Sequence, residues 1–129
     1  MMAGRAHAKP SDVTVEFWAA ADRGVLLLQN DARTGRCQFF PRPVNLFGET
    51  KSQWKAASGL GTLVAVTTVR VPAPGFEAPY LVGLIKLAEG PRVFARLLNA
   101  GPNVALGQKV RLAWEPGGEG PRLYAFEPA

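Results

Sequence analysis

Apolar and polar residues alternate over most of the second half of the chain, from Ser58 to Glu127. A period of two is the pattern of an extended strand with one face buried. The pattern predicts five strands, which contain Leu63–Val71, Leu81–Leu87, Val93–Leu97, Lys109–Trp114 and Arg122–Phe126. Because Gly or Pro occurs in the joins, five strands in so short a stretch predict a small closed barrel, most often an OB-fold.

The first of these strands shows how the pattern divides into two faces. Its alternation assigns Leu63, Ala65 and Thr67 to one face. Val64 and Val66 then belong to the other face. Both faces are largely apolar near the middle, which is typical of a strand that is covered on both sides.

A helical pattern precedes the strands. It predicts a helix over about residues 13–23, with Ser11 or Asp12 as its N-cap. Phe17 and Trp18 are the large apolar residues of this helix. Two interpretations stay open: the helix packs on its own domain, or Phe17 and Trp18 anchor it in another subunit, because aromatic residues are favoured interface anchors.

Two short extended runs follow the helix, at residues 25–29 and 36–40, with a polar turn between them. This arrangement predicts a hairpin, and Pro41 and Pro43 then interrupt regular structure. The chain is therefore expected to divide into three segments. They are a tail and helix at 1–24, a small knuckle at 25–57, and the barrel at 58–129.

Composition narrows the class of protein. The chain has 129 residues, 47% of them hydrophobic, which suits one globular domain. The net charge of +5 favours an anionic partner. The apolar runs are too short to cross a membrane, and the N-terminus lacks the apolar core of a secretory signal. A single cysteine, Cys37, fits a reducing compartment, so we expect a cytoplasmic protein.

Catalytic motifs are not evident in the sequence. The one histidine, His7, is far in sequence from Cys37, and nothing near either residue would orient it as a base or nucleophile. The Gly59-Leu60-Gly61 stretch precedes a strand and does not match a phosphate-binding loop. We therefore predict that the chain is not an enzyme on its own.

Basic and aromatic residues share faces on three predicted strands. The groups are Arg92, Phe94 and Arg96; Lys109 and Arg111; Arg122 and Tyr124. If these faces adjoin, they form a basic surface with an aromatic inset. Such a surface suits a phosphate-bearing ligand or a single nucleic-acid strand. It is equally compatible with a solvated face in which Phe94 and Tyr124 belong to the core.

Several ordered motifs make a resemblance to a known family. They are FWAAADRGVLLLQ at 17–29, FFPRPV at 39–44, SGLGTL at 58–63, PYLVGLIKLAEGPRV at 79–93 and LGQKVRLAW at 106–114. With these motifs in this order, the chain resembles the domain-of-unknown-function family 35 (DUF35). The resemblance implies a helical N-terminus, a rubredoxin-like zinc ribbon and an OB-fold.

The sequence departs from the family at the zinc ribbon. Family members usually carry two cysteine pairs, whose four thiolates suit tetrahedral zinc. Alignment on the flanking motifs places the first pair at Asp31 and Thr34 and the second at Asn45 and Gly48. Cys37 is out of register with both turns. We therefore predict a degenerate, metal-free knuckle.

Other contacts must then hold the knuckle together. Leu46 and Phe47 are the apolar residues expected to replace the lost cross-link. Asp31, Thr34 and Asn45 can close their turns through side-chain hydrogen bonds to the backbone.

The resemblance also implies a function. Family members are non-catalytic partners of thiolase-like enzymes, aldolase-type enzymes or acyl-CoA hydratases. The expected role is therefore an accessory subunit of a hetero-oligomer that shares a CoA thioester with its partner and binds no permanent cofactor. The alternative is a nucleic-acid-binding OB-fold module.

Specific residues are candidates for these contacts. For the CoA thioester they are Arg42, Phe76, Arg92 and Arg96, and for the partner they are Phe17, Trp18 and Trp54. Phe76 lies in a loop rich in Pro and Gly, where it either contacts a partner or acyl-pantetheine arm or caps the barrel mouth.

Overall fold

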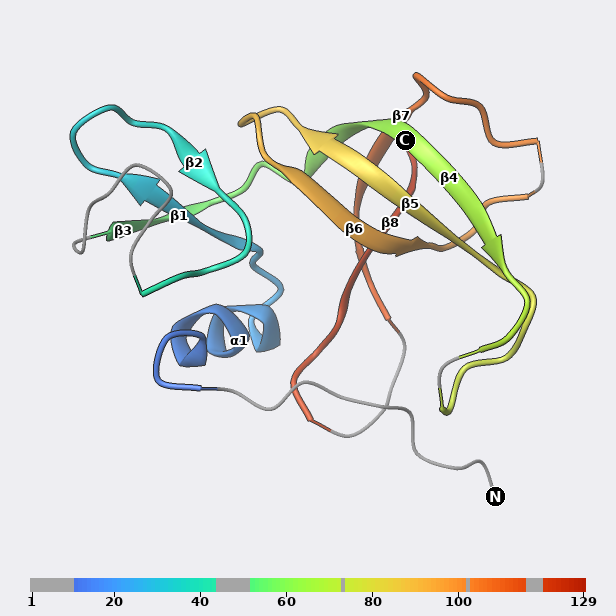
Figure 1. The fold of residues 1–129 in the computed structure, drawn as a ribbon, viewed down its shortest axis with the longest axis horizontal. Helices are drawn as coiled ribbons and strands as arrows, with labels where there is room; N and C mark the ends of the chain where they lie inside the picture. The colour runs from blue at the N-terminus through green and yellow to red at the C-terminus, as the bar shows by residue number, and fades with distance from the viewer. Residues whose placement is uncertain (1–10, 44–51, 73, 102, 116–119) are drawn as a thin grey trace.

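The chain folds into a five-stranded barrel with a helix and a small sheet beside it (Figure 1). The computed structural model describes residues 11–43, 52–72, 74–101, 103–115 and 120–129. Within these ranges, no helix is long and apolar enough to cross a membrane.

The helix α1 runs from Val15 to Asp22 and is shorter than the sequence pattern predicts. Thr14 is the N-cap, and its side chain makes no capping bond. Neither Ser11 nor Asp12 caps the helix, because Ser11 and Thr14 hydrogen-bond each other and form a preceding turn. Gly24, with φ of 78°, ends the helix in the left-handed conformation that glycine favours.

The small sheet follows the helix directly. It contains β1 (Leu27–Asp31), β2 (Cys37–Gln38) and β3 (Ser52–Ala56), in the order β2-β1-β3. Both pairings are antiparallel, so β1 is the central strand. In Figure 1 the helix lies beside this sheet, at the end of the molecule away from the barrel's long hairpin.

The barrel contains the five strands that the alternation predicts. They are β4 (Leu60–Val69), β5 (Tyr80–Leu87), β6 (Arg92–Leu97), β7 (Lys109–Trp114) and β8 (Tyr124–Pro128). The barrel closes in the order β4-β5-β6-β8-β7, with β4 paired to β7. This is the strand order of an OB-fold, so the predicted mainly β fold is confirmed.

A bulge in β4 changes which residues face inward. Leu63 pairs with Ile85, but the next partner, Leu84, lies opposite Ala65. The extra residue shifts the alternation by one position. Leu63 is therefore buried whereas Val64 and Ala65 are both exposed. The prediction that Leu63 and Ala65 share a face was wrong, because a strict period of two contains no bulge.

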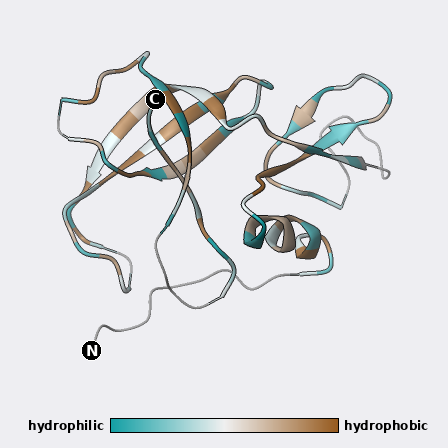
Figure 2. Cartoon of the chain, turned by 180° about the vertical axis from the view of Figure 1, so that it is seen from behind, coloured by the Kyte–Doolittle hydropathy of each residue, from teal (hydrophilic) through white to brown (hydrophobic). Residues whose placement is uncertain are grey.

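The inward positions of the strands form the barrel core. Its fully buried members include Leu63, Ile85, Leu87, Val93, Val110 and Phe126. Hydrophobic and hydrophilic segments alternate along the barrel strands, as expected for walls with one wet face (Figure 2).

An aromatic cluster joins the helix and the small sheet to the barrel. Its members are Phe17 and Trp18 from α1, Phe39 and Phe40 after β2, and Tyr124 from β8. The Phe17 ring centroid lies 4.8 Å from that of Trp18, 4.9 Å from Phe40 and 6.0 Å from Tyr124. Burial raises the pKa of Tyr124 to about 12, because the phenolate would lose hydration there.

A hydrogen-bonded pair closes the turn between β1 and β2. The Thr34 hydroxyl donates to Asp31 Oδ2 at 2.6 Å, and the backbone N–H of Arg33 donates to Oδ1 at 3.3 Å. The bond from Thr34 lowers the pKa of Asp31 below its ordinary value. Asp31 and Thr34 thus close their turn as predicted. The corresponding predictions for Asn45, Gly48, Leu46 and Phe47 lie outside the described residues.

Gln29 of β1 holds the chain that follows β2. Its Nε2 donates to the carbonyl oxygen of Arg42 at 2.8 Å, and the Arg42 N–H donates back to Gln29 Oε1 at 2.7 Å. Gln38 Nε2 also donates to Gln29 Oε1. Gln29 is buried, so these bonds satisfy polar atoms that would otherwise be costly.

Gly61 is a position where the barrel leaves no room for a side chain. A Cβ there would lie 2.5 Å from Ile85 Cγ2 and 2.9 Å from the Lys86 carbonyl oxygen. We expect Gly61→Ala to lower the free energy of unfolding by about 1–3 kcal/mol, the usual cost of overpacking. Gly101→Ala, with nothing within 4 Å of the added Cβ, is the control in urea unfolding. Equal effects of the two substitutions would contradict the packing described here.

The lowered pKa of Asp31 should make the free energy of unfolding depend on pH. Since its pKa is lowered in the folded state, the ionised carboxylate contributes stability that is complete above about pH 4 and is lost as the pH falls through the folded pKa. Thr34→Val removes the hydroxyl donor. We expect its urea midpoint to lie below that of the natural chain at pH 7, with the gap narrowing below about pH 4. Thr34→Ser, which keeps the hydroxyl, is the control; a gap that is constant with pH contradicts the assignment.

Candidate functional site

An open groove lies at one rim of the barrel, where β4 ends, β5 begins and β6 ends. Its volume is about 740 Å³. The lining residues are Thr68, Arg70, Pro79, Tyr80, Leu81, Arg96, Leu97, Leu98, Asn99 and Ala100. The β4–β5 hairpin brings the lining residues at the end of β4 next to those at the start of β5, because Val69 pairs with Tyr80. The groove is thus lined by apolar side chains together with basic, aromatic and amide groups.

Arg96 is the most constrained side chain of the groove. Its Nη1 lies 2.9 Å from Oε2 of Glu115, whose side chain is only 2% exposed. The guanidinium carbon is 5.7 Å from the Phe76 ring centroid and 5.3 Å from that of Tyr80. The buried carboxylate offsets the charge of Arg96 and fixes its position. Arg96 Nε is buried without a hydrogen-bond partner, so one donor of this guanidinium remains unsatisfied.

Arg70 and Asn99 occupy the outer parts of the groove. Arg70 is exposed, and no ion pair joins it to another residue in the part of the chain that the structure describes. Asn99 has a positive φ of 52°, and its Nδ2 donates to Glu127 Oε2 at 2.8 Å. Arg70 is therefore the cation of the groove that an anionic ligand reaches without first breaking an ion pair.

A second, smaller hollow lies against the helix and the small sheet. Its volume is about 250 Å³. The residues that line it are Asp12, Val13, Glu16, Gln29, Arg42, Pro43 and Trp54. Arg42 is exposed there, and Gln29 holds its backbone. The structure thus brings together the predicted candidates Arg42 and Trp54, but it places them apart from the groove.

The structure also brings Phe76 and Arg96 together. The Phe76 ring lies beside the Tyr80 ring at a tilt of 39°, with centroids 5.7 Å apart, and Phe76 is half-buried. Arg92 is different: it is exposed four residues before Arg96, roughly 13 Å away along the strand. Arg92 therefore does not line the groove.

The aromatic pair of the helix is buried within the chain itself. Phe17 is 1% exposed and Trp18 is 7% exposed. The prediction that Phe17 and Trp18 anchor the helix in another subunit does not fit this burial. Phe39, Phe40 and Tyr124 of the same chain already cover the two side chains. The other interpretation, a helix that packs on its own domain, describes the structure.

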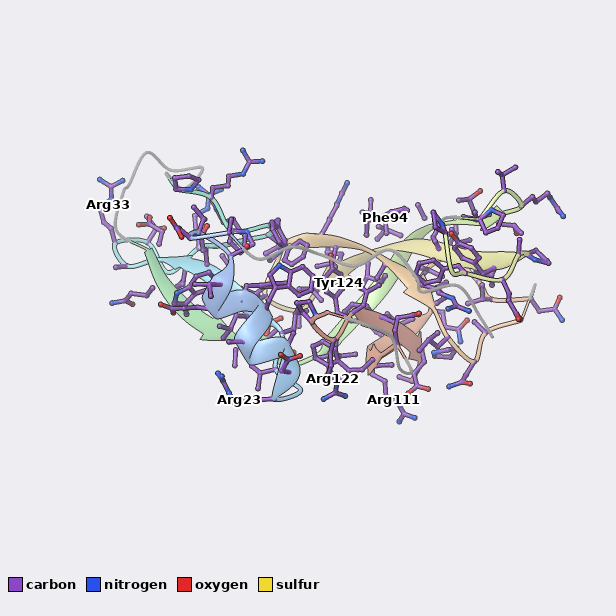
Figure 3. The ribbon with its side chains drawn as sticks, turned by 90° about the horizontal axis from the view of Figure 1, so that it is seen from below. Arg23, Arg33, Phe94, Arg111, Arg122 and Tyr124 are labelled. Carbon is purple, nitrogen blue, oxygen red and sulfur yellow. The ribbon has the colours of Figure 1, made fainter. Side chains whose placement is uncertain are left out.

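The proposed joint basic surface does not form as a single face. In the barrel, β8 separates β6 from β7. Tyr124 lies in the aromatic cluster, and Arg122 stacks over the Trp114 ring at 5.0 Å. In Figure 3, Phe94 projects from one side of the ribbon, whereas Arg111 and Arg122 project from the opposite side.

Sequence reasoning did not identify Arg70 and Tyr80 as site residues. Both are at strand ends that flank the loop containing Phe76. The available signal was their position: a hairpin that pairs Val69 with Tyr80 must place Arg70 at the same rim. The Arg96–Glu115 pair had no such signal, because it joins residues far apart in the sequence.

A metal site is not evident in the described residues. No group of three or more His, Cys, Asp or Glu side chains there is arranged to hold an ion. At the first cysteine-pair position, the Asp31–Thr34 hydrogen bond occupies the turn. The Cys37 thiol lies 3.8 Å from Asn30 Oδ1 and is partly buried.

Solved structures share this architecture. A chain of a structure titled "Ltp2-ChsH2(DUF35) aldolase" aligns with a TM-score of 0.85 and 26% identity, over 95% of this chain and 98% of that one. A protein of unknown function from the DUF35 family of Sulfolobus solfataricus aligns with a TM-score of 0.60 over 79% of this chain and 78% of that one. At 12% identity, that second likeness concerns the fold alone.

Sequence comparisons agree with the fold. The family model of the ChsH2 C-terminal OB-fold domain matches residues 54–115. A probable enoyl-CoA hydratase alpha subunit of Thermomonospora curvata is 33% identical over 75 residues, which are 57% of this chain but only 24% of that protein. A DUF35 domain-containing scaffold protein of Pyrococcus furiosus is 32% identical over 97 residues, which are 73% of this chain and 71% of that protein. The chain therefore belongs to the DUF35 family.

Proposed function

We propose that this protein is a non-catalytic accessory subunit that binds an acyl-CoA enzyme and helps to hold the CoA thioester. The partner is a thiolase-like enzyme, an aldolase-type enzyme or an acyl-CoA hydratase. The observation that carries the proposal is the rim groove, which is lined by the exposed cation Arg70, the Tyr80 ring and apolar side chains.

Family relatives support the accessory role. One relative is named a scaffold protein, another is named a hydratase subunit, and a structural neighbour comes from an aldolase structure. A chain of this kind acts by docking, since it can contribute binding groups while the catalytic groups come from the partner.

The groove fits the parts of a CoA thioester one by one. Arg70 is an exposed cation that can grip a phosphate in bidentate fashion. The half-buried Leu81 and Leu98 offer apolar surface to the pantetheine arm. Tyr80 also lines the groove, 5.3 Å from the Arg96 guanidinium carbon, where its ring can pack against the ligand.

The candidate residues then take different roles. Arg96 forms part of the groove wall and is held there by Glu115, and Phe76 lies beside both Arg96 and Tyr80 without lining the groove. Arg42 and Trp54 lie in the second hollow, where we propose a contact with the partner enzyme rather than with CoA. The subunit's contribution to catalysis is then orientation of the ligand, a proximity effect.

Arg70 provides the test of ligand binding. Calorimetric titration of CoA into the chain, alone and with its partner, should give a Kd at least about tenfold higher for Arg70→Ala, because the variant loses its charge-assisted hydrogen bonds to the phosphate. Arg23→Ala removes an exposed cation of the helix and should leave the Kd unchanged. Pantetheine, which has no nucleotide phosphates, should bind both variants equally. Failure of CoA to bind either form, or equal Kd values for both Arg variants, would contradict the proposal.

The accessory role predicts a stable complex. The tagged full chain, purified from its native cells, should retain an acyl-CoA enzyme of one of the three classes, identified by mass spectrometry. That enzyme should lose activity when the chain is removed and regain it when the chain is returned. An enzyme that elutes separately and keeps full activity alone would contradict the role.

A nucleic-acid-binding OB module is the alternative that the basic charge raises. It predicts tight binding of a short single-stranded oligonucleotide, with an affinity that falls steeply as salt is raised. Such binding in the absence of CoA binding would favour this alternative over the accessory role.

A further inference from the structure

The outer face of β4, β5 and β6 has an exposed apolar row. The strand register places Ala65, Leu84 and Phe94 directly side by side across the three strands. Val64, the residue displaced by the bulge, lies next to Ala65. Phe94 is 63% exposed and Val64 is 36% exposed, so the row faces solvent. Without the bulge in β4, Val64 and Ala65 would point to opposite faces.

A basic row runs beside the apolar row. Lys109 of β7 pairs with Thr62 of β4, Thr62 pairs with Lys86 of β5, and Lys86 pairs with Arg92 of β6. The three cations are exposed. Lys109 Nζ donates to the Thr62 hydroxyl at 3.1 Å. We call the apolar row, together with Lys86 and Arg92, the β4–β6 face.

Leaving the β4–β6 face exposed to solvent costs the isolated chain stability in two ways. Lys86 and Arg92 are directly opposite on adjacent antiparallel strands, a position in which like charges destabilise a sheet. Among the residues that the structure describes, neither makes an ion pair. Phe94 adds a large exposed aromatic ring two residues from Arg92. A partner that buries the ring and brings negative charge would relieve both costs.

We propose that the β4–β6 face docks the enzyme partner through a surface with an apolar depression bordered by carboxylates. Phe94 enters the depression, and the carboxylates lie opposite Lys86 and Arg92. This inference rests on the proposed function and specifies its interface. Arg96, on the same outward side of β6 as Phe94, belongs to the groove wall, so the docked partner borders the groove.

The residue types on the β4–β6 face fit a protein partner better than a nucleic-acid partner. Single strands bind where several aromatic rings stack with successive bases. On the β4–β6 face, Phe94 is the one aromatic residue, and its neighbours Leu84, Ala65 and Val64 are aliphatic. Aliphatic side chains around one aromatic ring and a charged border are typical of a protein interface with a central anchor.

The complex tests the face directly. Phe94→Ser and the double variant Lys86→Glu/Arg92→Glu should each raise the Kd for the co-purified enzyme by at least about tenfold. The double variant should also slow association and reduce its salt dependence. Val15→Ser removes an exposed apolar residue of the helix, and Arg23→Glu reverses a cation there; both should leave the Kd within about twofold. Unchanged thermal unfolding of each variant confirms that its fold is intact.

The outcomes separate the two proposals. A complex that forms equally well with Phe94→Ser and with the double variant overturns the docking face and leaves the accessory role standing. The same is true if Val15→Ser and Arg23→Glu weaken binding as much. If no enzyme binds the natural chain, the accessory role fails.

A peptide measurement tests the face without the enzyme. Fluorescence anisotropy of the natural chain with a labelled twelve-residue peptide of alternating Glu and Leu should show binding that both face variants lose. Peptides of alternating Lys and Leu or of alternating Glu and Ser should bind at least about tenfold more weakly. No binding of the Glu-Leu peptide, equal binding of the Glu-Ser peptide, or tighter binding of a twelve-nucleotide thymidine strand each overturns the inference.

Discussion

The aromatic cluster between α1, the chain after β2, and β8 is the interaction on which the N-terminal third depends. A helix of eight residues is marginal alone, and a three-stranded sheet this small needs a face to pack against. Burying each large side chain of the cluster contributes about 1.5–3 kcal/mol. Phe17 supplies the central ring, with contacts to all the others. The knuckle and the barrel therefore form one unit through apolar contact.

The N-terminal third depends more strongly on the aromatic cluster because the first turn of the knuckle has no thiolates to hold a metal. A structural zinc contributes on the order of 10 kcal/mol to folding, whereas one hydrogen bond contributes about 1 kcal/mol. The Asp31–Thr34 bond and the two Gln29–Arg42 bonds keep the local geometry of the turns. They cannot match a metal in energy. Among the described residues of this region, the aromatic cluster therefore supplies more stability than these hydrogen bonds, and the same burial removes Phe17 and Trp18 from the surface.

The sequence predicted the parts of the fold that follow from periodicity. Alternation identified the five barrel strands, and the helical pattern identified α1 to within two residues at its start. The bulge at Val64 was not predictable in this way, because one inserted residue breaks the period without changing composition. The Arg96–Glu115 pair was also missed, since a contact between distant residues requires the strand order to be known. Position along the strands was a better guide to the site than residue type: Arg92 and Arg96 share a face but have different surroundings.

The regular spacing of Arg92, Phe94 and Arg96 on β6 has an evolutionary consequence. The three side chains stand outside the barrel because each is an even step from the next, while Val93, Ala95 and Leu97 fill the interior. Exchanging the exposed side chains of Arg92 or Phe94 alters partner preference and leaves the barrel intact, whereas Arg96 is constrained by the buried carboxylate of Glu115. An insertion or deletion of a single residue would instead turn the charged groups inward and the core outward. Descendants of this chain are therefore free to vary in chemistry at Arg92 and Phe94 of β6, but not in the length of that strand.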